Sequence, residues 1–198
     1  MRILYFLKRY VYLTMVLCAG WLSLGRAFGQ ERDREEDERG VHKVSVSLGH
    51  AHVHEGIEGD EKKWLVMGSW GINYDYLINS RWAIGFHNDV ILEEFKVEDH
   101  HGEDESSILE RERPWAAKLV GSFKPFKHLS LLAGAGEEIA KEKNYFISTA
   151  GIEYGWHLPG GWELGAEISY DVKWNAYDTW IAGVGISKLI HRHRPHKD

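Results

Sequence analysis

Three histidines stand at every second position in the segment SLGHAHVHEG. His50, His52 and His54 would line one side of a β-strand, because successive side chains of a strand point to opposite faces. Two imidazoles on one face can supply two ligands to Zn²⁺, Ni²⁺ or Cu²⁺. His100 and His101 lie in a second candidate segment, EDHHGEDE, among carboxylates. These five histidines are the candidate metal ligands, and we expect no other cofactor. The simpler alternative is a polar rim that is rich in histidine by composition, since the tail HRHRPHKD uses histidine freely too.

The elements that would carry these histidines are strands. Residues 64–78 show the clearest pattern: the even positions are almost all apolar or aromatic, and the odd ones include Ser69, Asn73 and Asp75. A two-residue period of this kind indicates a strand with one apolar face. The period recurs over residues 42–53, 82–92, 115–123, 128–139, 146–156, 162–174 and 180–187. Eight such segments predict an all-β fold, an eight-stranded antiparallel up-and-down transmembrane β-barrel.

The N-terminus predicts export. Residues 1–29 contain a basic start, an apolar stretch and small residues at a cleavage position, as in a secretory signal peptide. An uncleaved anchor is the alternative, but the apolar stretch is shorter than the roughly 20 residues that a spanning helix needs. Cleavage removes Cys18, the only cysteine, so the mature chain can form no intramolecular disulfide. The rest divides into a charged flexible segment, a barrel and a His/Arg-rich tail: residues 30–40, 41–190 and 191–198.

Charge excludes one class of partner. The chain has a formal net charge of −6. The signal peptide has four basic residues and no acid, so its removal gives −6 − 4 = −10. Nucleic-acid binding calls for clustered Lys and Arg, and we therefore expect no nucleic-acid partner.

The connections between the predicted strands alternate in length. HEGIEGDEKK, KVEDHHGEDESSILERER and EEIAKEK are long, whereas NS, KPFK and LPGG are short. Short periplasmic turns and longer outer loops are typical of outer-membrane barrels. The pattern predicts an outer-membrane location with both termini periplasmic.

Two features favour a membrane barrel over a soluble one. Bulky aromatic residues gather at the strand ends, where membrane interfaces select them. The polar face is rich in Gly and Ser, which suits a narrow lumen better than a solvent-washed face. The alternative is a soluble, periplasmic, lipocalin-like barrel that binds a small apolar ligand inside.

The polar face of a membrane barrel would form its lumen. We expect a network of salt bridges and hydrogen bonds around Lys118 and His87, and no open pore, because side chains fill an interior of this size. A proton or cation site is the sharper alternative, because acids outnumber bases there. The predicted lumen residues are Asp75, His87, Asp89, Glu93, Lys118, Glu153, Glu167 and Asp171, with Asn73 and Glu163 beside them.

The facing of the three alternate histidines depends on one glycine. Val44, Val46 and Leu48 set an even apolar phase, which would carry His50, His52 and His54 outward into the headgroup zone. A bulge at Gly49 would instead turn the histidines toward the lumen. Either phase puts them near the outer rim.

Over the whole mature length the chain resembles the small eight-stranded outer-membrane proteins of the OmpA/OmpX type. The resemblance rests on the signal peptide, strand count, aromatic girdles and loop asymmetry. It implies a monomer whose partners are outer-membrane lipid and the outer-membrane assembly machinery. One departure is that such barrels usually end on an aromatic residue, whereas the last strand here ends SKLI.

The function expected from this resemblance is non-enzymatic: surface interaction, envelope integrity or divalent metal binding. A lipid-modifying enzyme is the remaining alternative. The lipid-facing positions contain no serine two residues from a histidine, and the chain contains no GxSxG motif.

Overall fold

The computed structural model describes residues 39–58, 61–99 and 107–191. The predicted signal peptide and the first part of the charged segment lie outside the described residues, as do His100, His101 and residues 192–198 of the tail. Contacts divide the chain into two units, 1–36 and 37–198, and every described residue belongs to the second. No helix in this described part is long and apolar enough to span a membrane.

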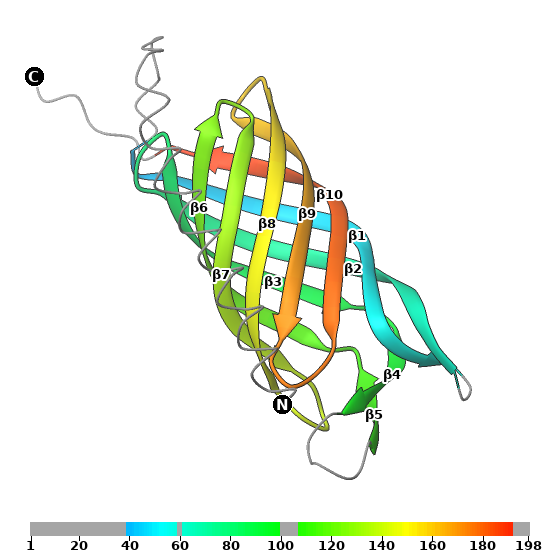
Figure 1. Ribbon diagram of the computed structural model, residues 1–198. Coiled ribbons are helices and arrows are strands. Elements are labelled where there is room, and N and C mark those ends of the chain that lie inside the picture. The colour runs from blue at the N-terminus through cyan, green and yellow to red at the C-terminus, as the bar shows by residue number, and fades with distance from the viewer. Residues whose placement is uncertain (1–38, 59–60, 100–106, 192–198) are drawn as a thin grey trace, which may run out of the picture. The chain divides into compact units, whose positions relative to one another are not determined.

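Ten strands make up the described unit (Figure 1). Eight of them form a closed antiparallel barrel, because each pairs with the next and β10 pairs back with β1. The predicted eight-stranded up-and-down barrel is therefore confirmed. Its strands are β1 (Val41–Glu58), β2 (Glu61–Leu77), β3 (Trp82–Ile91), β6 (Trp115–Phe126), β7 (Leu129–Ile139), β8 (Tyr145–Leu158), β9 (Trp162–Lys173) and β10 (Asp178–Ile190).

The register of these pairs sets the strand tilt. A circuit that starts at Val41 returns to β1 at Ala51, 10 residues further along (51 minus 41). A stagger of this size over eight strands corresponds to a tilt of about 40° and leaves an interior that side chains can fill. The pairs of the circuit are Val41–Leu77, Leu77–Ala83, Ala83–Ser122, Ser122–Leu132, Leu132–Gly151, Gly151–Ser169, Ser169–Ile181 and Ile181–Ala51.

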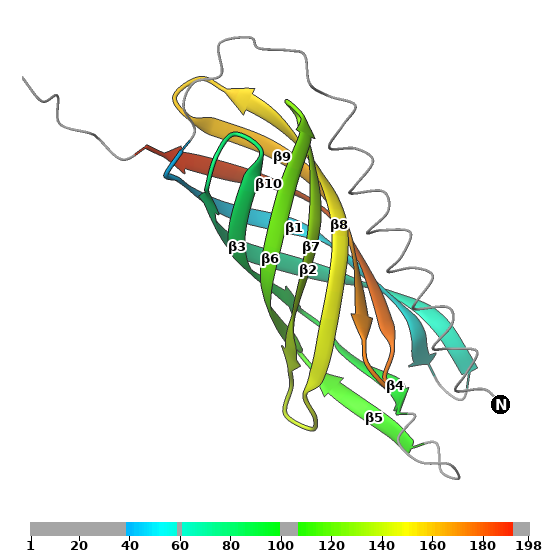
Figure 2. The same cartoon turned by 60° about the vertical axis from the view of Figure 1, so that its left-hand side comes forward.

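The second long connection contains a hairpin that the sequence analysis did not predict. β4 (Glu94–Asp99) and β5 (Ser107–Glu112) pair with each other beyond the barrel end that is opposite the short turns (Figures 1 and 2). β4 also pairs with the extension of β1, through Gly56 with Val97 and Ile57 with Lys96. Each strand of the hairpin is short and lies among charged residues, so its alternation was hidden in a segment that reads as a solvated loop.

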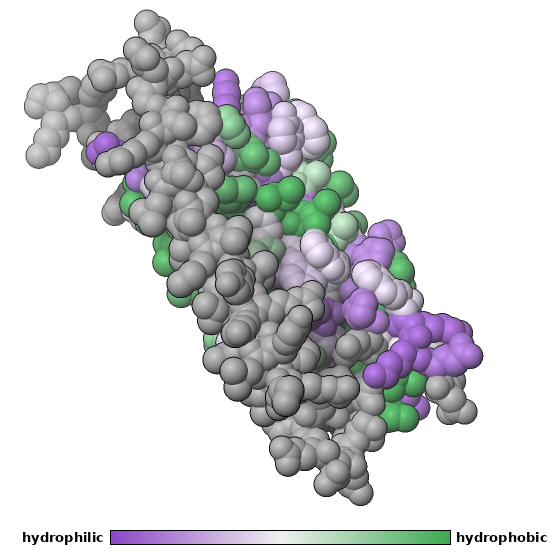
Figure 3. Space-filling view, in the orientation of Figure 1, coloured by the Kyte–Doolittle hydropathy of each residue, from purple (hydrophilic) through white to green (hydrophobic). Residues whose placement is uncertain are grey.

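The outer surface of the barrel is apolar, and its interior is charged. Leu48 is 66% exposed and Val184 is 62% exposed, whereas Lys118 is 3% exposed. Apolar side chains form a band across the strands, with hydrophilic ones toward the ends (Figure 3). A soluble barrel would bury its apolar face, so the lipocalin-like alternative does not fit. The chain is a transmembrane barrel, with Trp82, Trp162 and their neighbours at one rim and Trp115, Trp174 and theirs at the other.

Candidate functional site: the charged lumen and the hairpin mouth

One strand supplies an acid or base at successive levels of the lumen. The inward positions of β9 include Glu163, Glu167, Asp171 and Lys173, in order from the short-turn end to the hairpin end. The strand geometry spaces these groups along the barrel, because inward positions recur every second residue. Glu163, Asp171 and Lys173 form ion pairs with charged side chains of other strands.

The level nearest the short turns is centred on Lys43 of β1. Its Nζ lies 2.7 Å from Glu153 Oε1 and 2.6 Å from Glu163 Oε1. His157 Nε2 lies 3.2 Å from the second oxygen of Glu163. Lys43 and Glu163 are buried, so this is a desolvated charge cluster rather than a surface ion pair.

Two further groups fill the middle of the barrel. Lys118 Nζ lies 2.7 Å from Asp89 Oδ2 and 3.1 Å from Asp171 Oδ2. Separately, His87 Nε2 lies 3.0 Å from Asp75 Oδ1. Lys118 of β6 contacts β3 and β9, and the His87 contact joins β3 to its neighbour β2. The Lys118 cluster therefore links β6 to β9, two strands that are not neighbours in the barrel.

Small inward residues make room for the carboxylates. A Cβ on Gly85 would lie 2.0 Å from Asp75 Oδ1, and a Cβ on Gly155 would lie 2.7 Å from the carboxyl carbon of Glu163. One cavity of the lumen has a volume of about 40 Å³ and is lined by polar groups that include Ser45, Asn73 and Glu167. This volume holds a few water molecules and no larger solute.

The end of the lumen beside the β4–β5 hairpin, the hairpin mouth, carries a further buried ionic cluster, centred on Glu138 of β7. An Nη2 of Arg111, from the β5 hairpin strand, donates to Glu138 Oε1, and the Tyr177 hydroxyl donates to the same oxygen at 2.6 Å. Lys173 Nζ lies 3.4 Å from the other oxygen. Arg111 also donates to the Lys143 carbonyl at 2.5 Å. Burial and the Glu138 charge raise the pKa of Tyr177 well above its ordinary value of 10.0, so this hydroxyl remains a donor.

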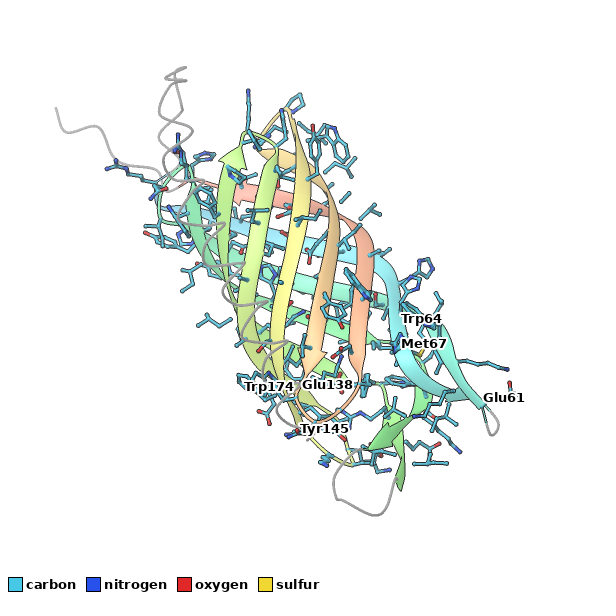
Figure 4. All side chains as sticks on the ribbon, in the orientation of Figure 1. Glu61, Trp64, Met67, Glu138, Tyr145 and Trp174 are labelled. Carbon is cyan, nitrogen blue, oxygen red and sulfur yellow. The ribbon has the colours of Figure 1, made fainter. Side chains whose placement is uncertain are left out.

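Apolar clusters lie at both ends of the charged lumen. At the hairpin end, Phe95 and Val97 of the hairpin pack with Tyr145 and Tyr177, and Figure 4 shows Glu138 and Tyr145 at this end. At the short-turn end, Val41, Leu77 and Leu189 pack together. The Glu138 cluster is therefore shielded by apolar side chains, whereas His157 of the short-turn cluster is exposed.

Seven of the eight predicted lumen residues occupy inward positions. Glu93 is the exception, and its prediction was wrong: β3 ends at Ile91, so the alternation that pointed Glu93 inward stops before it. Glu93 is exposed on the bend and accepts a hydrogen bond from the Gly68 amide at 3.2 Å. The seven are Asp75, His87, Asp89, Lys118, Glu153, Glu167 and Asp171.

Four charged residues were missed. Lys43, Glu138 and Lys173 continue the polar phase of β1, β7 and β9, so the alternation itself could have identified them. Arg111 could not have been identified from the sequence, because the charged residues around it hide the period of its short strand. The missing residues are mostly cations, which explains why the predicted lumen had so few bases.

The three alternate histidines keep the outward phase of β1. The pairing of β1 with both neighbours runs without a break through Gly49 to Val53, so the bulge that would turn them inward is not there. The ring of His54 packs edge-on against Trp64, 4.9 Å between centroids. Among the described residues, no three His, Cys, Asp or Glu side chains are grouped to hold a metal ion, and His100 and His101 lie outside them.

The chain is similar to some solved structures of small outer-membrane proteins. No protein-family model and no curated protein matches the chain. Ail, the attachment invasion locus protein of Yersinia pestis, is 18% identical over 75% of this chain and 99% of its own, with a TM-score of 0.48. OprG from Pseudomonas aeruginosa is 9% identical over 78% and 98%, with a TM-score of 0.48. Neisserial surface protein A is 12% identical over 76% and 99%, with a TM-score of 0.40. These similarities concern strand arrangement, and the assignment as a membrane barrel rests on the pairing and the exposed apolar band.

Proposed function

We propose that this chain is a non-enzymatic, closed outer-membrane barrel that presents its hairpin end for surface interaction. The observation that supports this most strongly is the anchoring of β4 and β5 by Arg111 to Glu138, which fixes the hairpin over a sealed mouth. A lumen crossed by ion pairs and shielded by apolar clusters offers no route for a solute. The surface beyond the girdle is then the part that remains available to partners.

The hairpin has the character of a presented surface. Ile108 is 63% exposed, and Lys96, Glu110 and Glu112 are exposed on the same hairpin. An apolar residue beside charged ones is a common arrangement in protein-binding patches. A partner with an apolar side chain and groups of both charges would match it.

Orientation and exposure are tested by cysteine labelling. The only cysteine, Cys18, lies in the predicted signal peptide, so a single cysteine introduced into the mature chain reports one site. We expect a membrane-impermeant maleimide to label Glu112→Cys on intact Gram-negative cells, and to label the matched control Lys127→Cys only after the envelope is opened. Labelling of Lys127→Cys alone on intact cells would refute the proposed orientation.

Closure and the absence of catalysis need their own measurements. The refolded mature chain in a planar bilayer should give no stepwise conductance, and phospholipid vesicles containing it should release no fatty acid. Discrete conductance steps would refute the closed lumen, and released fatty acid would refute the non-enzymatic role. The heat-dependent shift of folded barrels on gels verifies insertion in both assays.

Divalent metal binding is the second candidate. Its support is the shared outward face of His50, His52 and His54 on β1, and the His54 ring against Trp64. We expect calorimetric titration of the tag-free refolded chain with Zn²⁺, Ni²⁺ or Cu²⁺ to give binding that is lost when these three become Ala, and Cu²⁺ to quench Trp64 fluorescence. Binding that survives in the triple variant would assign the metal elsewhere, and no binding would end the idea.

A further inference from the structure

The two ends of the barrel differ in surface charge. The short-turn end carries Arg81 and Lys127 in or beside its turns and Lys188 near the end of β10. Its described carboxylates are those of Asp75, Glu153 and Glu163, all of which occupy inward positions and pair with a lysine or histidine. Among the described residues, the lipid-facing surface of this end therefore shows positive charge without negative charge.

The opposite end has no such bias. Its exposed acids include Glu61, Glu94 and Glu112, and its exposed bases include Lys96 and Lys141. Lys141 Nζ lies 3.5 Å from Glu112 Oε2, so part of this charge is paired. In the described part of the chain, the segregation of charge thus identifies the short-turn end as the one suited to an anionic surface.

The base on β10 is held at the level of the aromatic girdle. Lys188 pairs in register with Trp162. Its Nζ donates to the Gly160 carbonyl at 2.6 Å and lies 4.8 Å from the centre of the Trp162 ring. Tryptophan at a barrel rim lies at the depth of lipid headgroups. An ammonium fixed beside it is placed where headgroup phosphates lie.

The other two bases are carried by rigid turns. In the β2–β3 turn, Asn79 Oδ1 accepts hydrogen bonds from the amides of Arg81 and Trp82, both at 2.9 Å. The Lys124 amide donates to the Arg81 carbonyl at 2.8 Å, which joins this turn to the end of β6 beside Lys127. Arg81 and Lys127 are both exposed. Ordered turns present their charges at little cost in backbone entropy.

We propose that Arg81, Lys127 and Lys188, the basic rim, bind the headgroup phosphates of anionic phospholipids in the leaflet on the short-turn side. The proposal rests on membrane insertion and not on any role of the hairpin end. Each base near an anionic lipid surface improves its attraction by about fivefold, and an intervening carboxylate would cancel this. The aromatic side chains of the same rim provide the apolar contact for the acyl chains.

The test compares two triple variants of the mature chain in detergent. The rim variant is Arg81→Gln, Lys127→Gln and Lys188→Gln, and the matched control removes three bases at the other end, Lys62→Gln, Lys96→Gln and Lys141→Gln. Native mass spectrometry counts bound phosphatidylglycerol against phosphatidylcholine of the same acyl chains. We expect the wild type and the control to favour phosphatidylglycerol by at least about tenfold, and the rim variant to lose this preference.

Two outcomes would overturn the proposal: no lipid preference in the wild type, or an equal loss in the control. The heat-dependent gel shift shows whether each variant is folded, so failure of insertion is distinguished from failure of lipid recognition. If the rim variant does not fold, the salt dependence of lipid binding by the wild-type protein tests the proposal instead. Its preference should vanish at about 1 M NaCl, where the screening length is about 3 Å, and a preference that persists there refutes an electrostatic rim.

Discussion

Replacing Lys118 by Met tests whether the central ion cluster holds the barrel together. Met keeps most of the volume of the lysine chain and removes its charge, so the change isolates electrostatics from packing. Asp171, whose side chain is 2% exposed, and Asp89, whose side chain is 17% exposed, then both lose their contact with the Lys118 ammonium group. We expect the variant to fold, with a reduced free energy of unfolding.

The magnitude follows from the two contacts. At distances of 2.7 and 3.1 Å and an effective dielectric constant of about 20, the attractions are about 6 and about 5 kcal/mol. Desolvation of the ammonium offsets a large part of this sum, several kcal/mol in practice. Removal of one partner from such a buried group costs about 3–5 kcal/mol. We therefore expect Lys118→Met to lower the free energy of unfolding by about that amount.

Urea titration in lipid vesicles, followed by tryptophan fluorescence, measures this change. Lys141→Met is the control, because Lys141 is exposed and its ion pair is weak, and its effect should lie within about 0.5 kcal/mol. The triple variant with Asp89→Asn and Asp171→Asn should recover much of the loss, since the buried charges are then gone. A loss below about 1 kcal/mol for Lys118→Met, or no recovery in the triple variant, would refute the reasoning.

Three further changes probe the mouth and the lumen. Because the pKa of Tyr177 is raised in the folded state, its contribution to the free energy of unfolding is complete below pH 10 and declines as the pH rises above it. Urea titrations should therefore show that the wild type loses more stability between pH 9 and about 11 than Tyr177→Phe does. Equal losses would contradict this. Gly85→Ala places a Cβ 2.0 Å from Asp75 Oδ1 and should cost about 1–3 kcal/mol in the same assay, whereas Gly121→Ala, whose nearest neighbour would be 3.7 Å away, should cost little; similar costs would refute the close approach. Arg111→Met should release the hairpin and make the segment 94–112 more sensitive to protease on intact vesicles, and unchanged cleavage would show that the apolar contacts suffice.

The barrel was predictable because its period is strict. Over residues 64–78 and 162–174 the apolar face must meet lipid at every second position, so the sequence carries the strand and its facing together. The hairpin is different, because β4 and β5 lie beyond the barrel end and only a few of their residues, Phe95, Val97 and Leu109, pack in the apolar cluster of the mouth. Three apolar residues among charges give no readable period.

The lumen shows the same division. Which residues face the lumen follows from the alternation along each strand, and this placed Asp75, His87 and Asp171 on the inward face. Which of them form ion pairs does not follow from it. The contact of Lys118 with Asp171 joins β6 to β9 across the barrel, and such a contact depends on the stagger of all eight strands. Alternation in one strand contains no information on that stagger, so the partners could be found only from the closed structure.

A charged interior also has a reason outside the folded state. If the inward positions of β9, such as Glu163 and Asp171, were apolar, the segment 162–174 would be a continuous apolar run, and several such strands would be prone to aggregate before the barrel closes. Alternating charge keeps one face of each strand polar. Closure must then accommodate these charges, and the structure does so by giving Lys43, Lys118 and Lys173 carboxylate partners from different strands. The ion network of the lumen thus meets two requirements, because the same charges interrupt apolar runs in the separate strands and join the strands of the closed barrel.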